Sequence, residues 1–210
     1  MPTVRPAART DADTVPELVL QSDCGLLPAL FGPRVKSLLE WLLPRPGNPY
    51  SRSNTLVIEE DVAAPAGLSG PAGSNVIGAM VGSLIAAARG SNLRTAGYLA
   101  RWYGPAVIAR LPRLARAGGA VESLARDDFY LSHIAVLPGC RGRGAGAQLL
   151  RASEDRARGL GARRLVLDVE EHNAGARAFY ARMGYGQVSV VRIDLGGHGL
   201  FSFLRLARDL

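Results

Sequence analysis

The chain has 210 residues and contains little of several residue types, and each shortage argues against a class of protein. Its two cysteines, Cys24 and Cys140, lie far apart, which argues against a disulfide-stabilised domain and for free thiols in a reducing compartment. The three histidines are scattered, so no metal site is expected. No apolar run approaches the roughly 18 residues of a membrane span, and the N-terminus lacks a signal-peptide pattern. We therefore expect a cytoplasmic protein with no membrane partner.

Lysine is nearly absent, because only Lys36 among the 25 basic residues is a lysine. The formal net charge of +7 and the isoelectric point of about 10.1 would suit a nucleic acid or a small polyanion. The arginines are spread along the chain rather than clustered, and the arginine-, alanine- and glycine-rich composition is typical of a genome-wide bias. We expect no nucleic-acid partner, although a basic nucleic-acid-binding domain remains an alternative.

The hydrophobic pattern predicts a mixed α/β chain, with strand–helix–strand–helix–strand at its centre. Strands are expected at 4–7, 54–59, 76–85, 129–137, 164–169, 187–194 and 200–206, and helices at 11–22, 31–43, 147–160 and 173–183. No internal repeat or boundary divides the chain, so residues 1–210 are interpreted as a single domain. The segment 62–75 is rich in Pro, Gly, Ala and Ser and is expected to be a flexible hairpin loop, and Gly78 and Gly82 mark possible β-bulges.

Residues 90–119 are predicted to form a helical insertion of two short amphipathic helices with interleaved arginines. Three roles are open for it: packing on the domain, a lid or wall over a substrate site, and attachment to a membrane surface. Some of its side chains suggest a substrate with an acidic or aromatic part. They are Arg94, Arg101, Tyr98, Trp102 and Tyr103.

The most informative segment runs from the end of one strand, Ile134–Val136, through an arginine- and glycine-rich turn into a helix. Glycines let a ligand approach the main chain, and a helix N-terminus directs free backbone N–H groups at an anion. The turn therefore predicts a pyrophosphate site, with a plain connecting turn as the alternative. No Gly-Lys-Ser/Thr follows it, and the third glycine of a dinucleotide fingerprint is absent.

Two sequence motifs, one after the other along the chain, resemble those of a known family. Arg141-x-x-Gly144-x-Gly146 resembles the acyl-CoA-binding motif of the GNAT superfamily of N-acetyltransferases. The segment from Asn173 to Tyr185 is similar to that family's Asn-x-x-Ala-x-x-Phe-Tyr-x-x-x-Gly-Phe/Tyr motif. The resemblance covers about residues 129–190. It implies a mostly antiparallel mixed sheet of six to seven strands, flanked by helices and splayed between two parallel strands.

The same resemblance implies acetyl-CoA as cofactor. The pantetheine arm would pair with the backbone of Ala135 and Val136, Asn173 would contact this arm, and Tyr180 would face the sulfur. The pyrophosphate would bind the residues of the turn, which are Arg141, Gly142, Arg143, Gly144, Ala145 and Gly146. Relatives of this kind often dimerise through their C-terminal strands, so a homodimer is a further expectation.

The implied reaction is direct attack of a primary amine, from a small molecule or a peptide, on the thioester. Tyr180 would assist the leaving thiolate, with a purely structural core aromatic as the alternative. The sequence leaves the identity of the general base unassigned, because the family often has Glu or Asp where this chain has Ser132 and His133. His133 has a suitable ordinary pKa of about 6.5, and strand alternation would put it on the face of Leu131 and Ala135.

Further alternatives are a proton relay through Glu170 and Glu171, and a covalent acyl-cysteine at Cys140. A second function also fits the resemblance: a catalytically weak acyl-CoA-binding sensor or scaffold of the same fold. The missing acidic residue on the strand favours this alternative, whereas the intact Arg141 and Tyr180 favour the transferase.

Overall fold

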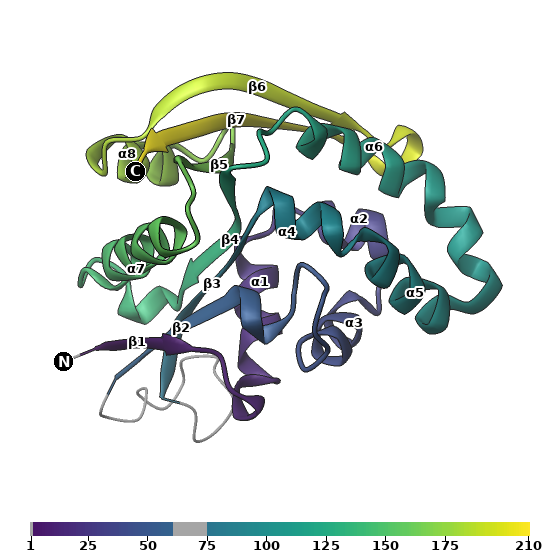
Figure 1. Cartoon of the computed structure of the whole chain (residues 1–210), viewed down its shortest axis with the longest axis horizontal. Helices are drawn as coiled ribbons and strands as arrows, with labels where there is room; N and C mark the ends of the chain where they lie inside the picture. The colour runs from purple at the N-terminus through teal and green to yellow at the C-terminus, as the bar shows by residue number, and fades with distance from the viewer. Residues whose placement is uncertain (1, 61–74) are drawn as a thin grey trace.

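A seven-stranded mixed sheet crosses the computed structural model, which describes residues 2–60 and 75–210 (Figure 1). The strands are β1 (Thr3–Pro6), β2 (Thr55–Glu59), β3 (Val76–Leu84), β4 (Asp128–Val136), β5 (Arg164–Glu170), β6 (Gly186–Asp194) and β7 (Leu200–Asp209). Their order is β1-β2-β3-β4-β5-β7-β6, and among the described residues only β4 and β5 pair in parallel. The predicted fold class is confirmed.

Helices flank this sheet, and Figure 1 shows α7 and α1 on opposite sides of the central strands. The α-helices are α1 (Thr14–Ser22), α2 (Leu26–Phe31), α3 (Val35–Leu42), α4 (Ile85–Gly90), α5 (Asn92–Tyr103), α6 (Leu111–Glu122), α7 (Ala145–Gly159) and α8 (Ala174–Arg182). Short 3-10 turns are η1 (Arg9–Asp11), η2 (Arg52–Asn54), η3 (Gly104–Arg110), η4 (Pro138–Cys140) and η5 (Gly196–His198). No helix in the described part of the chain is long and apolar enough to cross a membrane.

The apolar stripe predicted within residues 31–43 is buried and consists of Val35, Leu38, Leu39 and Leu42. The predicted start of this helix at Phe31 is wrong, because Phe31 ends α2 and Val35 begins α3. Gly32 separates them with a φ of 84°, and Pro33 follows without a backbone N–H. This pair ends one helix before the next can begin.

A β-bulge interrupts the regular pairing of β4 with β3. Gly82 lies opposite Leu131, but the residue before Gly82 lies opposite His133, so Ser132 has no partner on β3. The predicted bulge at Gly82 is confirmed, and another register shift adjoins Gly78. Because a bulge changes which residues share a face, the alternation expected between Leu131 and His133 is interrupted, whereas His133 and Ala135 remain in regular register.

β4 and β5 separate immediately beyond this bulge. Their parallel pairing joins Asp128–Leu131 to Arg164–Leu167 and stops there. β4 continues along β3 as far as Val136, whereas β5 continues along β7 as far as Glu170. In the described part of the chain, no strand lies beside β4 on its β5 side from residue 132 onward. The backbone polar groups on that edge need other partners.

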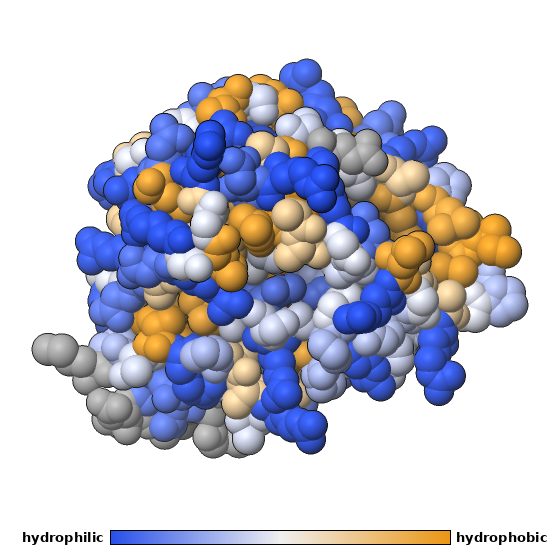
Figure 2. Space-filling view, in the orientation of Figure 1, coloured by the Kyte–Doolittle hydropathy of each residue, from blue (hydrophilic) through white to orange (hydrophobic). Residues whose placement is uncertain are grey.

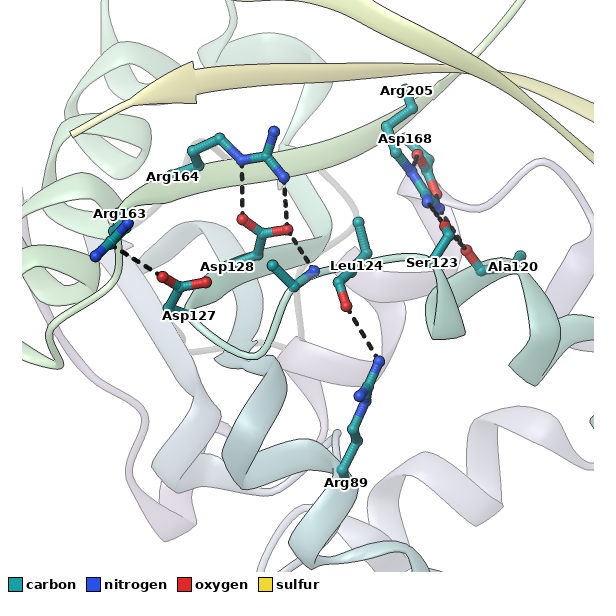
Figure 3. Close-up of polar contacts among 11 residues, drawn as sticks. Arg89, Ala120, Ser123, Leu124, Asp127, Asp128, Arg163, Arg164, Asp168 and Arg205 are labelled. Atoms are coloured by element: carbon teal, nitrogen blue, oxygen red, sulfur yellow. Dashed lines mark hydrogen bonds and ion pairs between the residues drawn. The ribbon is translucent and has the colours of Figure 1, made fainter.

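A buried ion pair ties α6 to the sheet near the point of separation (Figure 3). Arg205 of β7 donates two hydrogen bonds of 2.8 Å to Asp168 of β5. The same guanidinium donates to the Ser123 hydroxyl and the Ala120 carbonyl at the end of α6, each at 2.8 Å. Asp168 also accepts a hydrogen bond of 3.0 Å from the Tyr130 hydroxyl. Arg205 of β7 therefore links β5, through Asp168, to the end of α6.

The chain between β3 and β4 is helical and comprises α4, α5, η3 and α6, including the residues 90–119. Figure 2 shows apolar residues gathered on the right of the visible face, where α5 and α6 meet in Figure 1. Ile108 and Leu111 are exposed large apolar residues of this segment. The hairpin loop predicted at 62–75 lies outside the described residues except for Asn75.

Asp128→Asn is expected to lower the free energy of unfolding by about 1–3 kcal/mol at pH 7, because Asp128 is buried and accepts two hydrogen bonds from Arg164. Burial raises the pKa of Asp128, but hydrogen bonds from Arg164 and Ala125 and the charge of Arg164 outweigh it and keep the pKa below its usual value. The stabilisation is therefore present above the unfolded pKa of about 3.9 and is lost as the pH falls through the folded value. Urea unfolding across this pH range measures the effect.

Asp127→Asn is the matched control for this prediction. Asp127 pairs with Arg163 at 3.2 Å, but both side chains are largely exposed. Such a pair contributes about 0–1 kcal/mol, so the control is expected to unfold nearly like the wild type. Equal losses from the two variants would contradict the role assigned to Asp128.

Candidate functional site

A cleft of about 780 Å³ lies where β4 and β5 separate. Its lining comes from β4, the end of β5, α8 and the turn before α7, and also from the α1–α2 segment and α6. The predicted site residues that line it are Ser132, His133, Ala135, Val136, Arg141, Gly142, Gly144, Gly146, Asn173 and Tyr180. Arg143 and Ala145 do not, since Arg143 is exposed beside the turn and Ala145 is buried beneath it. The fold thus brings ten of the twelve predicted residues to one cavity.

The turn between β4 and α7 has the geometry of an anion site. Gly142 and Gly144 have φ angles of 76° and 86°, which side chains disfavour, and Gly144 is the N-cap of α7. The first N–H groups of α7 have no acceptor within the helix and lie at its positive end. Arg141 Nε donates to the Val136 carbonyl at 2.9 Å, which holds the guanidinium at the end of β4. The turn therefore brings together the Arg141 guanidinium, the positive end of α7 and the free N–H groups of that helix.

Asn173 opens α8 as predicted, because its side-chain oxygen accepts a hydrogen bond of 3.0 Å from the Ala176 N–H. Gly184 follows the last turn with a φ of 85°, which matches its predicted role as the C-terminal glycine. These two residues determine the length of α8 and hence the position of Tyr180.

Tyr180 is a buried aromatic residue that also lines the cleft, with 6% of its surface exposed. Its ring packs against Phe179 and Tyr185, with centroids 5.2 and 5.9 Å away. Burial raises the pKa of Tyr180, so the phenol is protonated near neutral pH. No described residue hydrogen-bonds to its hydroxyl. Tyr180 is thus a core residue whose O–H remains free to donate into the cleft.

The two predicted base candidates are both engaged in hydrogen bonds. The Ser132 hydroxyl donates to the Val81 carbonyl at 3.1 Å. His133 Nδ1 lies 3.1 Å from the Ser22 hydroxyl, and burial lowers the pKa of His133 to about 4. The pKa thus lies below the ordinary value of about 6.5 that made His133 a candidate base, because the imidazole is desolvated. It is neutral at pH 7 and a weak base.

Two carboxylates reach the cleft without a basic partner among the described residues. Asp23 follows α1 directly and caps α2 by accepting from the Leu27 N–H at 3.1 Å. Burial raises the pKa of Asp23, and its backbone hydrogen bonds oppose this rise. Glu170 lines the cleft from the end of β5, whereas Glu171 does not and instead accepts from the Ser202 hydroxyl at 2.7 Å. The sequence analysis missed Asp23, because α2, the helix that it caps, was not predicted.

Neither cysteine has the features of a nucleophile. Cys140 is buried, with 1% exposed, and does not line the cleft. Cys24 does line it, but burial, assisted by the charges of Asp23 and Glu170, raises the pKa of Cys24 to about 11. A thiol with such a pKa is almost fully protonated at pH 7.

The helical insertion contributes to the cleft through α6, where Ala117, Ala120 and Val121 line the wall. Its aromatic residues do not line it. Tyr98 and Trp102 pack against Trp41, with ring centroids 5.8 and 5.4 Å apart, and the Tyr103 hydroxyl donates to a backbone carbonyl of α2 at 2.6 Å. Arg94 and Arg101 are also absent from the lining. The substrate preference expected from these five side chains therefore has no geometric support.

The sequence matches one family model and parts of two curated proteins. Residues 35–185 match the model described as the Acetyltransferase (GNAT) family. An uncharacterised N-acetyltransferase, YhfO of Bacillus subtilis, is 42% identical over 57 residues, which are 27% of this chain and 38% of that protein. N-alpha-acetyltransferase 30 of Schizosaccharomyces pombe is 32% identical over 76 residues, 36% of this chain and 51% of that protein. The matched region thus spans about half of these relatives or less.

Solved structures share the fold over nearly the whole chain. An N-acetyltransferase from Staphylococcus aureus Mu50 superposes with a TM-score of 0.68 at 16% identity, covering 98% of this chain and 100% of that one. A structure described as an acetyltransferase has a TM-score of 0.64 at 22% identity, covering 99% and 98%. At such low identity the likeness concerns the fold alone.

Gly144→Ala is expected to lower the free energy of unfolding by about 1–2 kcal/mol, because a side chain at this left-handed position strains the backbone even in open space. Gly146→Ala is the matched control. It lies within α7, where an added Cβ would be 3.7 Å from Phe179, an ordinary contact. The control is expected to be neutral or more stable by up to about 1 kcal/mol. Urea unfolding of both variants provides the comparison, and similar destabilisation of the two would refute the assigned turn geometry.

Proposed function

The chain belongs to the GNAT family of acetyltransferases, and from this premise we propose that it transfers an acetyl group from acetyl-CoA to a primary amine. One observation carries the proposal: the cleft at the separation of β4 and β5 combines an anion-binding turn, an unpaired strand edge and a free phenol.

Each part of a coenzyme A thioester has a matching group along the cleft. We assign the pyrophosphate to Arg141 and the N–H groups of 142–146, with Arg143 adding charge nearby. Each charge-assisted hydrogen bond from a guanidinium contributes about 1.5–3 kcal/mol, against roughly 0.3–1 kcal/mol for the helix dipole. The pantetheine amides are assigned to the strand edge at Ala135 and Val136, where the Val136 carbonyl already accepts from Arg141, and to the Asn173 side chain. When bound, acetyl-CoA supplies an activated acetyl group and a thiolate leaving group.

Tyr180 is assigned to the sulfur of the thioester. A phenol that burial keeps protonated can donate a hydrogen bond to developing thiolate charge. Full proton transfer from a group of such raised pKa to a thiolate near 8.5 is unfavourable. The role of Tyr180 is therefore stabilisation by its O–H group before any complete transfer.

The acceptor amine is assigned to the part of the cleft near Asp23 and Glu170. These carboxylates have no basic partner among the described residues, whereas Asp168 is neutralised by Arg205. Their negative charge favours the approach of an ammonium in an otherwise basic protein. Removing a proton from an amine of pKa about 10.4 at pH 7 costs about 4.6 kcal/mol, so the amine must lose this proton on binding or through water.

The acyl-CoA sensor is the second candidate, and the weak basicity of His133 favours it. A sensor and a transferase share the same binding site. They differ in turnover, which makes the two separable in one set of measurements.

Calorimetry with acetyl-CoA tests the cofactor site. The wild-type protein is expected to bind with micromolar affinity, Arg141→Ala to lose at least about tenfold in affinity, and Tyr180→Phe to bind normally. If the protein is a transferase, Tyr180→Phe lowers kcat by about a hundredfold through the lost hydrogen bond. Binding without turnover of any amine would support the sensor, and no binding by the wild type would exclude both candidates.

Steady-state kinetics with n-butylamine and putrescine as acceptors test the amine site. Asp23→Asn and Glu170→Gln are each expected to raise the acceptor KM by about tenfold and to leave acetyl-CoA affinity unchanged, because each removes one charge from the amine side of the cleft. Glu171→Gln removes the same charge one residue away, outside the cleft lining, and is expected to behave like the wild type. An equal effect of all three variants would indicate only a long-range change in charge.

A further inference from the structure

His133 lies in the cleft at the bulge of β4, and its ring is held from two sides. Nδ1 is 3.1 Å from the Ser22 hydroxyl at the end of α1. The ring also lies against Tyr50, with a centroid distance of 5.9 Å and an angle of 37° between the planes. A flipped ring would place a carbon against Ser22 and lose the hydrogen bond. Ser22, Tyr50 and His133 all line the cleft.

The direction of the Ser22–His133 hydrogen bond follows from counting protons. The Ser22 hydroxyl lies 2.7 Å from the Val19 carbonyl, which can only accept. The Asp23 N–H, which would reach the Val19 carbonyl in a longer helix, donates to the Leu20 carbonyl instead. A hydroxyl has one proton, and this contact uses it. Toward His133, Ser22 therefore accepts, and Nδ1 must carry the hydrogen.

The remaining ring nitrogen is then left with a lone pair. Because burial lowers the pKa of His133 to about 4, the ring carries a single proton near neutral pH. With this proton on Nδ1, Nε2 is an acceptor. No described residue donates a hydrogen bond to Nε2, and the side chain borders the cleft.

We propose that Ser22 is a positioning residue that locks His133 in its Nδ1–H tautomer, so that Nε2 accepts an N–H of the acceptor amine. This inference rests on the proposed transfer to an amine. It also gives His133 a catalytic role other than that of the general base considered from the sequence.

The tautomer matters because a neutral amine offers two N–H donors and one lone pair. An Nε2 acceptor binds an N–H and leaves the lone pair free to attack a carbonyl carbon. An Nε2–H donor would instead bind that lone pair and block the attack. Ser22 thus decides whether His133 orients the nucleophile or inhibits it. As the C–N bond forms and the C–S bond breaks, the proton lost by the nitrogen passes through water to the leaving thiolate, whose thiol has a pKa near 8.5, since a group of pKa about 4 does not retain it at pH 7.

Long-range proton–nitrogen NMR of the histidine-labelled protein reads the tautomer directly, without substrate or turnover. The chain has three histidines, and His133→Gln identifies the signals of His133 among those of His172 and His198. At pH 7 the wild type is expected to show a protonated Nδ1 and an unprotonated Nε2. Ser22→Ala is expected to give a mixture of tautomers, and Ser22→Thr, which keeps the hydroxyl, to restore the first pattern. A protonated Nε2 in the wild type, or no change in Ser22→Ala, would overturn the inference.

Kinetics on the same proteins distinguish this inference from the proposed function. Ser22→Ala is expected to lower kcat/KM for n-butylamine about three- to tenfold, with Ser22→Thr near the wild-type value and acetyl-CoA affinity unchanged in both. If wild-type protein does not bind acetyl-CoA, the proposed function fails whatever the NMR shows. If it transfers acetyl groups and Ser22→Ala is as active as the wild type, the transfer stands and the role of Ser22 is excluded.

Discussion

The separation of β4 from β5 after four paired residues is the constraint on which the rest of the site depends. Backbone polar groups inside a protein need partners, and β5 cannot supply them beyond Leu167 because it follows β7. The bulge at Ser132 turns β4 away at the same level. Asp128–Leu131 and Arg164–Leu167 stay paired on one side of this point, and directly beyond it Asp168 and Arg205 hold β5, β7 and α6 together. The strands are thus fastened on one side of the bulge and open on the other, which leaves a strand edge suited to an amide-containing ligand.

Much of the fold could be predicted because its signals are local. Four predicted features are each determined by residues close together in sequence. They are the apolar stripe of α3, the cap at Asn173, the glycine turn before α7 and Gly184 after α8. The features that were missed depend on distant groups. Asp23 lies at the cleft beside the start of α2, where it accepts from the Leu27 N–H, and α2 was not predicted because the predicted helix began only at Phe31.

His133 shows the same limit for chemistry. Its ordinary pKa is a property of an imidazole in water, whereas its pKa in the fold follows from burial at the bulge. Sequence alternation could not place it relative to Leu131, because the bulge at Ser132 interrupts the period of two. The residue was found by its type and strand, but its protonation state required the tertiary surroundings, in particular Ser22 from α1, 111 positions away in sequence.

The cleft contains two kinds of polar side chain, those that carry charge and those that are neutral. Exposed or half-exposed groups supply the charge, with Arg141 at the turn and Asp23 and Glu170 elsewhere in the lining. Two groups, the buried Tyr180 and the half-buried His133, are kept neutral by desolvation. A neutral side chain can still act on a reaction, but only through the direction of its hydrogen bonds: Tyr180 can donate through its O–H group, and His133 accepts if Nδ1 holds the proton. In such a site a second residue that determines where one hydrogen lies, the role proposed for Ser22, acts on reactivity through hydrogen-bond direction and without a shift in pKa.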